Sequence, residues 1–226
     1  MALIISIETA TRACSVALHA EAELVASQTL HVDRSHAESL LCTIEHLFTI
    51  SPYTKEELNA VAISSGPGSY TGLRIGTSTA KGLCYALEIP LIAINTLEAM
   101  AYGMRPYNTS QALLCPMLDA RRMEVYCLLT DSKGDTLVAP HAQVIEKHSF
   151  QVWLQNHPIL FFGDGAEKCR PLMAHHNALF IAHIYPTACH VGALAHTKFQ
   201  QASFEDLAHF TPLYLKSFQG NTAKEV

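Results

Sequence analysis

The sequence predicts an α/β fold in which a mixed sheet carries helices on both faces. Three short apolar runs, at residues 3–7, 14–18 and 24–30, are joined by polar turns, as in an antiparallel meander. Helical patterns then alternate with apolar runs at residues 60–63 and 91–94. A meander followed by alternating helices and strands favours a mixed sheet with both faces covered.

A first helix is expected after the meander, where Asp33 or Ser35 can cap it. Glu38 stands three residues after Ser35, which is capping-box spacing, and Pro52 lies just past the expected end. Apolar side chains recur at helical spacing, at Leu40, Leu41, Ile44, Leu47 and Phe48. This stripe faces either the chain's own sheet or another protein chain.

The stretch from Gly66 to Leu83 combines a tight turn with a helix. Gly66, Pro67 and Gly68 cannot continue a strand, and Ser69 or Thr71 can cap the helix that follows. Within the helix Gly72, Gly76 and Ala80 recur every four residues, which suggests close approach of another backbone. The stretch therefore offers a turn with free N–H groups and a smooth helix face, and function could lie in either.

A second, shorter series of elements is expected after a polar stretch near residues 105–110. Strands are expected at residues 113–118, 124–129, 159–162 and 213–215, with helices near 152–154 and 187–200. Turns are expected at residues 133–135 and 163–165, and no internal repeat is detected. The predicted organisation is an N-terminal lobe of residues 1–105 and a smaller lobe of residues 106–226, the layout of ribonuclease-H-like and actin/sugar-kinase-like proteins.

Composition narrows the function classes. The 226 residues carry a formal net charge of −5, so no global basic field attracts nucleic acid. The seven cysteines include no CxxC pair, which fits reduced thiols in a cytosol. The start lacks a signal-peptide pattern, and no apolar run is long enough to span a bilayer. We expect a cytoplasmic protein without membrane contact, and the thirteen histidines lack metal-site spacing.

The weak candidates for chemistry are Glu8 and Thr9 at the end of the first strand, together with Gly66, Gly68 and Ser69 in the glycine turn. A carboxylate at that strand end can hold a divalent ion, and the turn can cradle phosphate at a helix N-terminus. The turn is not a P-loop, because no Lys-Ser/Thr follows the glycines. A solvated strand-end Glu and a turn needed only for packing are the competing explanations.

Six motifs, in this order, closely resemble the TsaB (YeaZ) family: residues 5–9, 35–41, 66–76, 80–83, 118–121 and 163–165. The match is dense up to about residue 125, and GPGSYTGLRIG at residues 66–76 is the most specific motif. Two departures are Glu8-Thr9-Ala10, where the family usually reads Asp-Thr-Ser, and Cys42, where a proline is usual.

The resemblance implies a degenerate relative of the transferase TsaD, with the two-lobed actin/sugar-kinase-like fold. In TsaD, two metal-binding histidines lie four residues apart in a motif that matches residues 95–100 here. Thr96 and Met100 stand at those positions, and neither replaces an imidazole ligand. The resemblance therefore implies a non-catalytic partner subunit that binds TsaD, with the ATPase TsaE, in making threonylcarbamoyladenosine in transfer RNA. The alternative is a nucleotide-dependent enzyme of the same fold class, using Glu8 and the loop from Gly66 to Ser69.

The resemblance also implies a homodimer when the chain is alone and a heterodimer with TsaD, with tRNA reached only through the complex. No cofactor of its own and no metal are expected; ATP or ADP would sit, if anywhere, at the interface of the complex. The expected contact residues come from the first helix and the glycine-rich helix. They are His36, Leu40, Leu41, Ile44, Leu47, Gly72, Ile75, Gly76, Thr79, Ala80 and Leu83.

Overall fold

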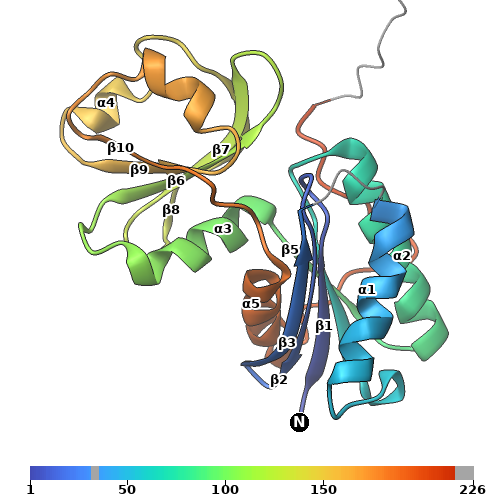
Figure 1. Cartoon of the computed structure of the whole chain (residues 1–226). Helices are drawn as coiled ribbons and strands as arrows, with labels where there is room; N and C mark the ends of the chain where they lie inside the picture. Colours follow the sequence, from blue (N-terminus) through green and yellow to red (C-terminus); the bar gives the residue numbers. More distant parts are fainter. Residues whose placement is uncertain (32–35, 217–226) are drawn as a thin grey trace, which may run out of the picture.

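The computed structural model describes residues 1–31 and 36–216, and it contains two five-stranded sheets in two lobes (Figure 1). The first sheet has the order β3-β2-β1-β4-β5, with β1 pairing antiparallel to β2 and parallel to β4. The predicted meander and the two following strands are confirmed. Their bounds are β1 Leu3–Glu8, β2 Cys14–Ala20, β3 Glu23–Leu30, β4 Ala60–Ser64 and β5 Leu91–Ile94.

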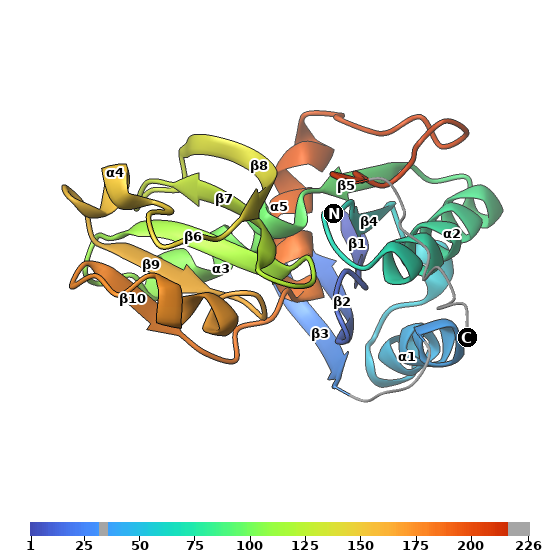
Figure 2. The same cartoon turned by 90° about the horizontal axis from the view of Figure 1, so that it is seen from above.

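Two long helices, α1 (His36–Ile50) and α2 (Tyr70–Leu87), cover one face of the first sheet (Figure 2). Alternation along β1 explains the packing, because Leu3, Ile5 and Ile7 join the core under these helices while Ile4 joins the core on the opposite face. A 3-10 turn, η1 (Lys55–Glu57), follows α1. The expected capping residues Asp33 and Ser35 lie outside the described residues.

The second sheet repeats the topology of the first. Its order is β10-β9-β6-β7-β8, with an antiparallel meander β6-β7-β8 and β9 and β10 added in parallel. The two lobes thus share one topology although the sequence shows no internal repeat. The strands are β6 Leu113–Asp119, β7 Glu124–Thr130, β8 Thr136–Val144, β9 Ile159–Phe162 and β10 Ala178–Ile181. Only short helices, α4 (Gln151–Leu154) and η3 (Glu167–Leu172), occupy the positions of α1 and α2.

Two helices cross between the lobes. α3 (Thr96–Met104), which η2 (Arg105–Tyr107) extends, follows β5 but packs on the second sheet, with Leu97 and Met100 against Leu114. α5 (Ala188–Gln200) follows β10 but packs on the first sheet, with Val191 and Ala195 against Ile4 (Figure 1). The expected boundary at residue 105 thus separates the strands of the two sheets along the sequence. It does not separate the packing, because α3 and α5 each pack on the sheet of the other lobe.

The segment after α5 returns along the edge of the first sheet. Glu205 forms a bridge with Leu91 of β5, and the Leu213 N–H donates to the Ser65 carbonyl at 2.7 Å. The strand expected at residues 213–215 is not formed, so that prediction is wrong. Nowhere in residues 1–31 and 36–216 does a helix have the length and apolar character needed to cross a membrane.

Candidate functional site

Glu8 ends β1 in the middle of the first sheet and is fully buried. Its Oε1 accepts the Ala10 N–H at 2.5 Å, whereas Oε2 has no hydrogen-bond partner within residues 1–31 and 36–216. Burial raises the pKa of Glu8 to about 7, and the nearby Ser64 hydroxyl and the Ala10 N–H act in the opposite direction. The explanation of a solvated strand-end Glu is therefore wrong. The carboxyl takes up a proton near neutral pH.

Thr9 explains the spacing of the glycines in α2. The Thr9 hydroxyl donates to the Gly72 carbonyl at 2.8 Å. A Cβ on Gly72 would lie 2.1 Å from the Thr9 carbonyl oxygen, and one on Gly76 would lie 2.3 Å from the Thr9 hydroxyl. Gly72, Gly76 and Ala80 are buried inside the chain. The prediction that this face packs against a partner is corrected: the backbone that approaches it is the end of β1.

The Gly66 turn is closed by its own chain. The Ser69 N–H donates to the Ala10 carbonyl at 2.6 Å, so that group is not free, contrary to expectation. A Cβ on Gly68 would lie 2.5 Å from Ala10, and one on Gly66 would lie 2.8 Å from the Leu213 carbonyl oxygen. The Ser69 hydroxyl accepts the Gly72 N–H at 3.3 Å and is the cap of α2. These contacts favour the packing explanation of the turn.

Thr96 and Met100 occupy the first two turns of α3. The Thr96 and Ser64 hydroxyls are hydrogen-bonded at 2.6 Å, and Met100 is buried in the core between α3 and the second sheet. Within residues 1–31 and 36–216, no three His, Cys, Asp or Glu side chains are grouped so that they could hold a metal ion. The absence of a metal remains a prediction.

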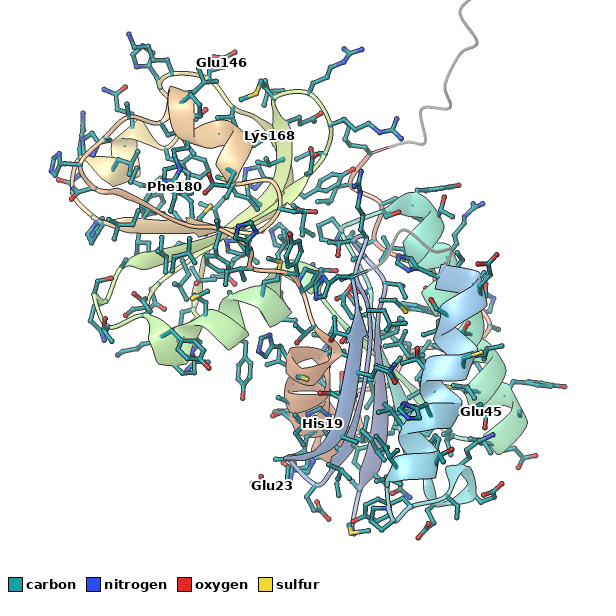
Figure 3. The ribbon with its side chains drawn as sticks, viewed as in Figure 1. His19, Glu23, Glu45, Glu146, Lys168 and Phe180 are labelled. Atoms are coloured by element: carbon teal, nitrogen blue, oxygen red, sulfur yellow. The ribbon has the colours of Figure 1, made fainter. Side chains whose placement is uncertain are left out.

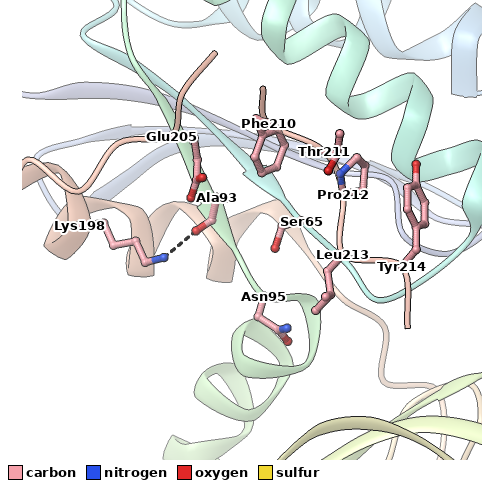
Figure 4. A pocket seen from close by; sticks show the side chains of 10 residues that line it. All are labelled: Ser65, Ala93, Asn95, Lys198, Glu205, Phe210, Thr211, Pro212, Leu213 and Tyr214. Atoms are coloured by element: carbon pink, nitrogen blue, oxygen red, sulfur yellow. Dashed lines mark hydrogen bonds between the residues drawn. The ribbon is translucent and has the colours of Figure 1, made fainter. Parts of the chain in front are cut away.

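An open pocket of about 490 Å³ lies beneath the segment that returns along β5 (Figure 4). Lys198 of α5 reaches into this region, where its Nζ donates to the Ala93 carbonyl at 2.8 Å. Ser65 and Asn95 line the pocket from the ends of β4 and β5. None of the predicted nucleotide residues lines it.

The remaining predicted residues divide between an inner and an outer face of α1 and α2. Leu40, Ile44 and Leu47 are buried in the core of the first sheet, which confirms the own-sheet explanation for them. His36 is tied inward, because its Nε2 lies 2.8 Å from the Thr11 carbonyl oxygen. Leu41 is 56% exposed. Ile75, Thr79 and Leu83 are half-buried.

The prediction missed a second row of small residues on α2. Ser78, Gly82 and Ala86 are all exposed, and a Cβ on Gly82 would meet no atom of the described part of the chain within 4 Å. Tyr85, beside them in the sequence, is 82% exposed. The signal was present, because these three residues also recur every four positions. The sequence alone did not show which of the two rows faces the sheet.

A sequence model of the family described as TsaD, tRNA N6-adenosine threonylcarbamoyltransferase, matches residues 22–226. A *Bacillus subtilis* protein named tRNA threonylcarbamoyladenosine biosynthesis protein TsaB is 30% identical over 167 residues, which cover 71% of this chain and 70% of the relative. The chain belongs to the TsaB family. An *Escherichia coli* TsaB of the same name is 40% identical over 123 residues, 54% of this chain and 52% of the relative. The match thus spans about half of the *E. coli* protein.

Solved structures confirm the actin/sugar-kinase-like fold of this TsaB-family chain. YeaZ from Pseudomonas aeruginosa matches with a TM-score of 0.80 at 25% identity. The match covers 95% of this chain and 100% of that protein. A P. aeruginosa protein described as similar to peptidase YeaZ matches with a TM-score of 0.82 at 24% identity. The match covers 96% of this chain and 100% of that protein. The activator of 2-hydroxyisocaproyl-CoA dehydratase from Clostridium difficile, with bound ADPNP, matches with a TM-score of 0.52 at 11% identity. The match covers 90% of this chain and 98% of the activator.

Proposed function

We propose that this TsaB-family chain is a non-catalytic accessory subunit. It binds and supports a TsaD-type threonylcarbamoyltransferase, together with a TsaE-type ATPase, in making threonylcarbamoyladenosine in tRNA. Membership of the TsaB family is the observation that carries the proposal. The closed packing around Glu8 and the Gly66 turn supports the non-catalytic part, because the loop that would cradle phosphate is bonded to Ala10 and covered by Leu213.

The outer face of α1 and α2 is the proposed partner surface. We define this outer face as Leu41, Ser78, Thr79, Gly82 and Tyr85. Gly in a helix interior costs about 1 kcal/mol relative to Ala. Among residues 1–31 and 36–216 nothing requires Gly82 to lack a side chain, unlike Gly72 and Gly76. A partner backbone lying close to Gly82 accounts for the residue, and exposed Leu41 adds apolar area.

The same surface serves a homodimer when the chain is alone and the heterodimer with a TsaD-type subunit. The formal net charge of −5 supports contact with tRNA only through the complex. The chain has no cofactor of its own, and any ATP or ADP sits at the interface of the complex. The proposed place of action is the cytoplasm.

Reconstitution tests the function. The chain is combined with TsaD-type and TsaE-type subunits, tRNA and the threonylcarbamoyl donor, and modified tRNA is measured by mass spectrometry with and without the chain. We expect modification only when the chain is present, and no ATP hydrolysis by the chain alone. Full modification in its absence, or modification by the chain without a TsaD-type subunit, would contradict the proposal.

One observation favours a second candidate, a nucleotide-dependent enzyme of the same fold class. The Oε2 of Glu8 is buried without a hydrogen-bond partner in the described part of the chain, at the strand end where a bound ion or phosphate could use it. This candidate predicts ATP turnover by the purified chain, and the turnover disappears in Glu8→Gln. Absence of turnover in the wild-type chain eliminates it.

A further inference from the structure

The second lobe contains a cluster of thiols around one histidine, on the face of the sheet covered by α4 and η3. Cys127 of β7 stands opposite His141 of β8 in the antiparallel register. Its Sγ lies 3.8 Å from Nε2 of His141. Cys115 of β6 and Cys169 of η3 belong to the same buried core. The proposed function uses none of these side chains.

Both ring nitrogens of His141 face oxygen acceptors. Nδ1 lies 2.9 Å from the Ala139 carbonyl oxygen, and Nε2 lies 3.1 Å from the Gln143 side-chain oxygen. The Ala139 carbonyl can only accept, so Nδ1 carries the proton of the neutral ring and the lone pair of Nε2 is left on the side of Cys127. The Cys127 thiol also lies 3.7 Å from the Gln143 side-chain oxygen. Transfer of the Cys127 proton to Nε2 gives an imidazolium ion, with the Cys127 sulfur as its counter-ion.

The neighbouring groups favour a negative charge on Cys127. A hydrogen bond from Cys115 and the proximity of His141 lower the pKa of Cys127 to about 6, against the effect of burial. The same contact with Cys127 raises the pKa of His141 to about 9. Burial raises the pKa of Cys169 to about 11, and it raises the pKa of Cys115 as well.

Two more charged groups act on this side of the lobe. Lys168 and Asp119 form an ion pair with each other, and both influence Cys169 (Figure 3 labels Lys168). Among the cysteines that the structure describes in this cluster, Cys127 is the one in contact with His141, so the thiolate is assigned to Cys127.

The strand pairing beside Cys127 is irregular. The β7–β8 register shifts between Cys127 and Leu129, next to Pro140, which has no N–H to give to the ladder. β8 is an edge strand of the second sheet. Cys127 is fully buried beneath half-buried His141, so a reagent must be small and uncharged to reach the sulfur.

We propose that Cys127, paired with His141, is a site of oxidation by hydrogen peroxide or a similarly small peroxide. The thiolate sulfur attacks one peroxide oxygen, and the O–O bond breaks. Sulfur gains a hydroxyl group and is oxidised by two electrons to a sulfenic acid. The departing hydroxide takes the Nε2 proton of His141 and leaves as water. A small thiol can reverse the change.

The test exposes the whole folded chain to hydrogen peroxide at pH 6 and at pH 8.5. The peroxide is quenched at successive times and the chain is unfolded in urea containing excess dimedone, which traps sulfenic acids, so that peptide mapping gives the labelling rate of each cysteine. Cys42, which is exposed, serves as the internal reference thiol. At pH 6 we expect Cys127 to be labelled about tenfold or more faster than Cys42, because an ordinary thiol is almost wholly protonated there. The proposal would be overturned if the labelling rate of Cys127 rose with pH in parallel with that of Cys42, or if Cys127 were not labelled at either pH.

Two variants assign the effect to the ion pair. His141→Gln is expected to lower the Cys127 rate at pH 6 by about tenfold, because it removes the counter-ion. His148→Gln, a control at an exposed histidine, is expected to leave it unchanged. Equal rates in the two variants would contradict the role of His141. If His141→Gln does not fold, the rates of the wild-type chain at the two pH values still decide.

Discussion

The two sheets share one strand order but differ in the helices that cover them. The first sheet carries α1 of 15 residues and α2 of 18, whereas the corresponding segments of the second sheet are α4 of 4 residues and η3 of 6. The first strands of the two lobes, β1 and β6, are both buried at their centres. Long helices are therefore not required by the topology. In the first lobe they provide an outer face as well as a cover for the core.

The two glycine turns show what the topology itself requires. After β4, the Ser69 N–H donates to the Ala10 carbonyl, in the turn that follows β1. After β9, the Gly165 N–H donates to the Met117 carbonyl, near the end of the equivalent strand β6. A Cβ on Gly165 would lie 2.8 Å from the Leu118 backbone. Both turns pack against the first strand of their own lobe, so a glycine turn here does not by itself indicate a phosphate site.

The largest effect is expected from a pair of substitutions within α2. Gly72→Ala should lower the free energy of unfolding by about 2–3 kcal/mol, because the new methyl group overlaps the Thr9 carbonyl. Gly82→Ala should raise it by up to about 1 kcal/mol, because the site is open and Ala favours the helix. Urea denaturation measures both. Equal effects of the two substitutions would contradict the assignment of an inner and an outer face.

Glu8→Gln should stabilise the chain by about 2 kcal/mol at pH 8 and have little effect at pH 4. The folded pKa of about 7 lies above the ordinary Glu pKa of 4.5, so folding takes up a proton between these pH values. The contribution of Glu8 to stability is greatest below pH 4.5 and is lost as pH rises through 7. Urea midpoints across this range give the result. A stability difference independent of pH would show that the carboxyl is not perturbed.

Two histidines, one in each lobe, should respond to pH in opposite directions. His19 packs against Gly192 of α5, and burial lowers its pKa to about 4 (Figure 3). The unfolded chain then takes up the proton first, so stability falls by about 1–2 kcal/mol as pH drops from 6.5 toward 4. The pKa of His141 is raised to about 9, so its contribution is present below pH 6.5 and lost as pH rises through 9.

Thermal unfolding of His19→Gln and His141→Gln over pH 4–10 separates these effects. The acid-side loss should shrink in the first variant, and the alkaline-side loss should shrink in the second. If one variant reduced both the acid-side and the alkaline-side loss of stability, the assignment would be contradicted.

The smallest effect is expected at the N-terminus of α2. Ser69→Ala should lower the free energy of unfolding by about 1 kcal/mol, because it removes the oxygen that accepts the Gly72 N–H. Thr71→Ala is the matched control, since Thr71 lies within α2 and is exposed. If Thr71→Ala destabilised the chain and Ser69→Ala did not, the assignment of Ser69 as the cap would be contradicted.

The sequence was sufficient for the first lobe because its elements carry strong periodic signals. The apolar runs at residues 60–63 and 91–94 became β4 and β5, and the run of small residues became α2. β8 was missed because it is a half-exposed edge strand interrupted by Pro140. β10 was missed because it is a partly exposed edge strand, whereas β9, which is equally short, is fully buried. Short edge strands depend on pairing with a neighbour, which no local pattern records.

The candidate site was harder to predict than the fold. Helical spacing grouped Gly72 with Gly76 and Ala80 correctly, but it could not show that β1 lies against them. That contact joins residues far apart in the chain. The burial of Glu8 also depends on distant residues, because it results from the pairing of β1 with β4. The exposed row at Ser78, Gly82 and Ala86 has the same spacing, so only the packed structure distinguishes the two rows.

The central claim, that the outer face of α1 and α2 binds the partner, is tested most directly by one binding measurement. Association of Gly82→Arg with a TsaD-type subunit is compared with that of Val152→Arg, a control at a 79% exposed residue of the second lobe. Both variants should fold with a melting temperature no lower than that of the wild type, since neither side chain has to enter the core. We predict that Gly82→Arg weakens association at least about a hundredfold, a loss of about 3 kcal/mol, while Val152→Arg binds like wild type. Wild-type affinity in a folded Gly82→Arg chain would contradict the account.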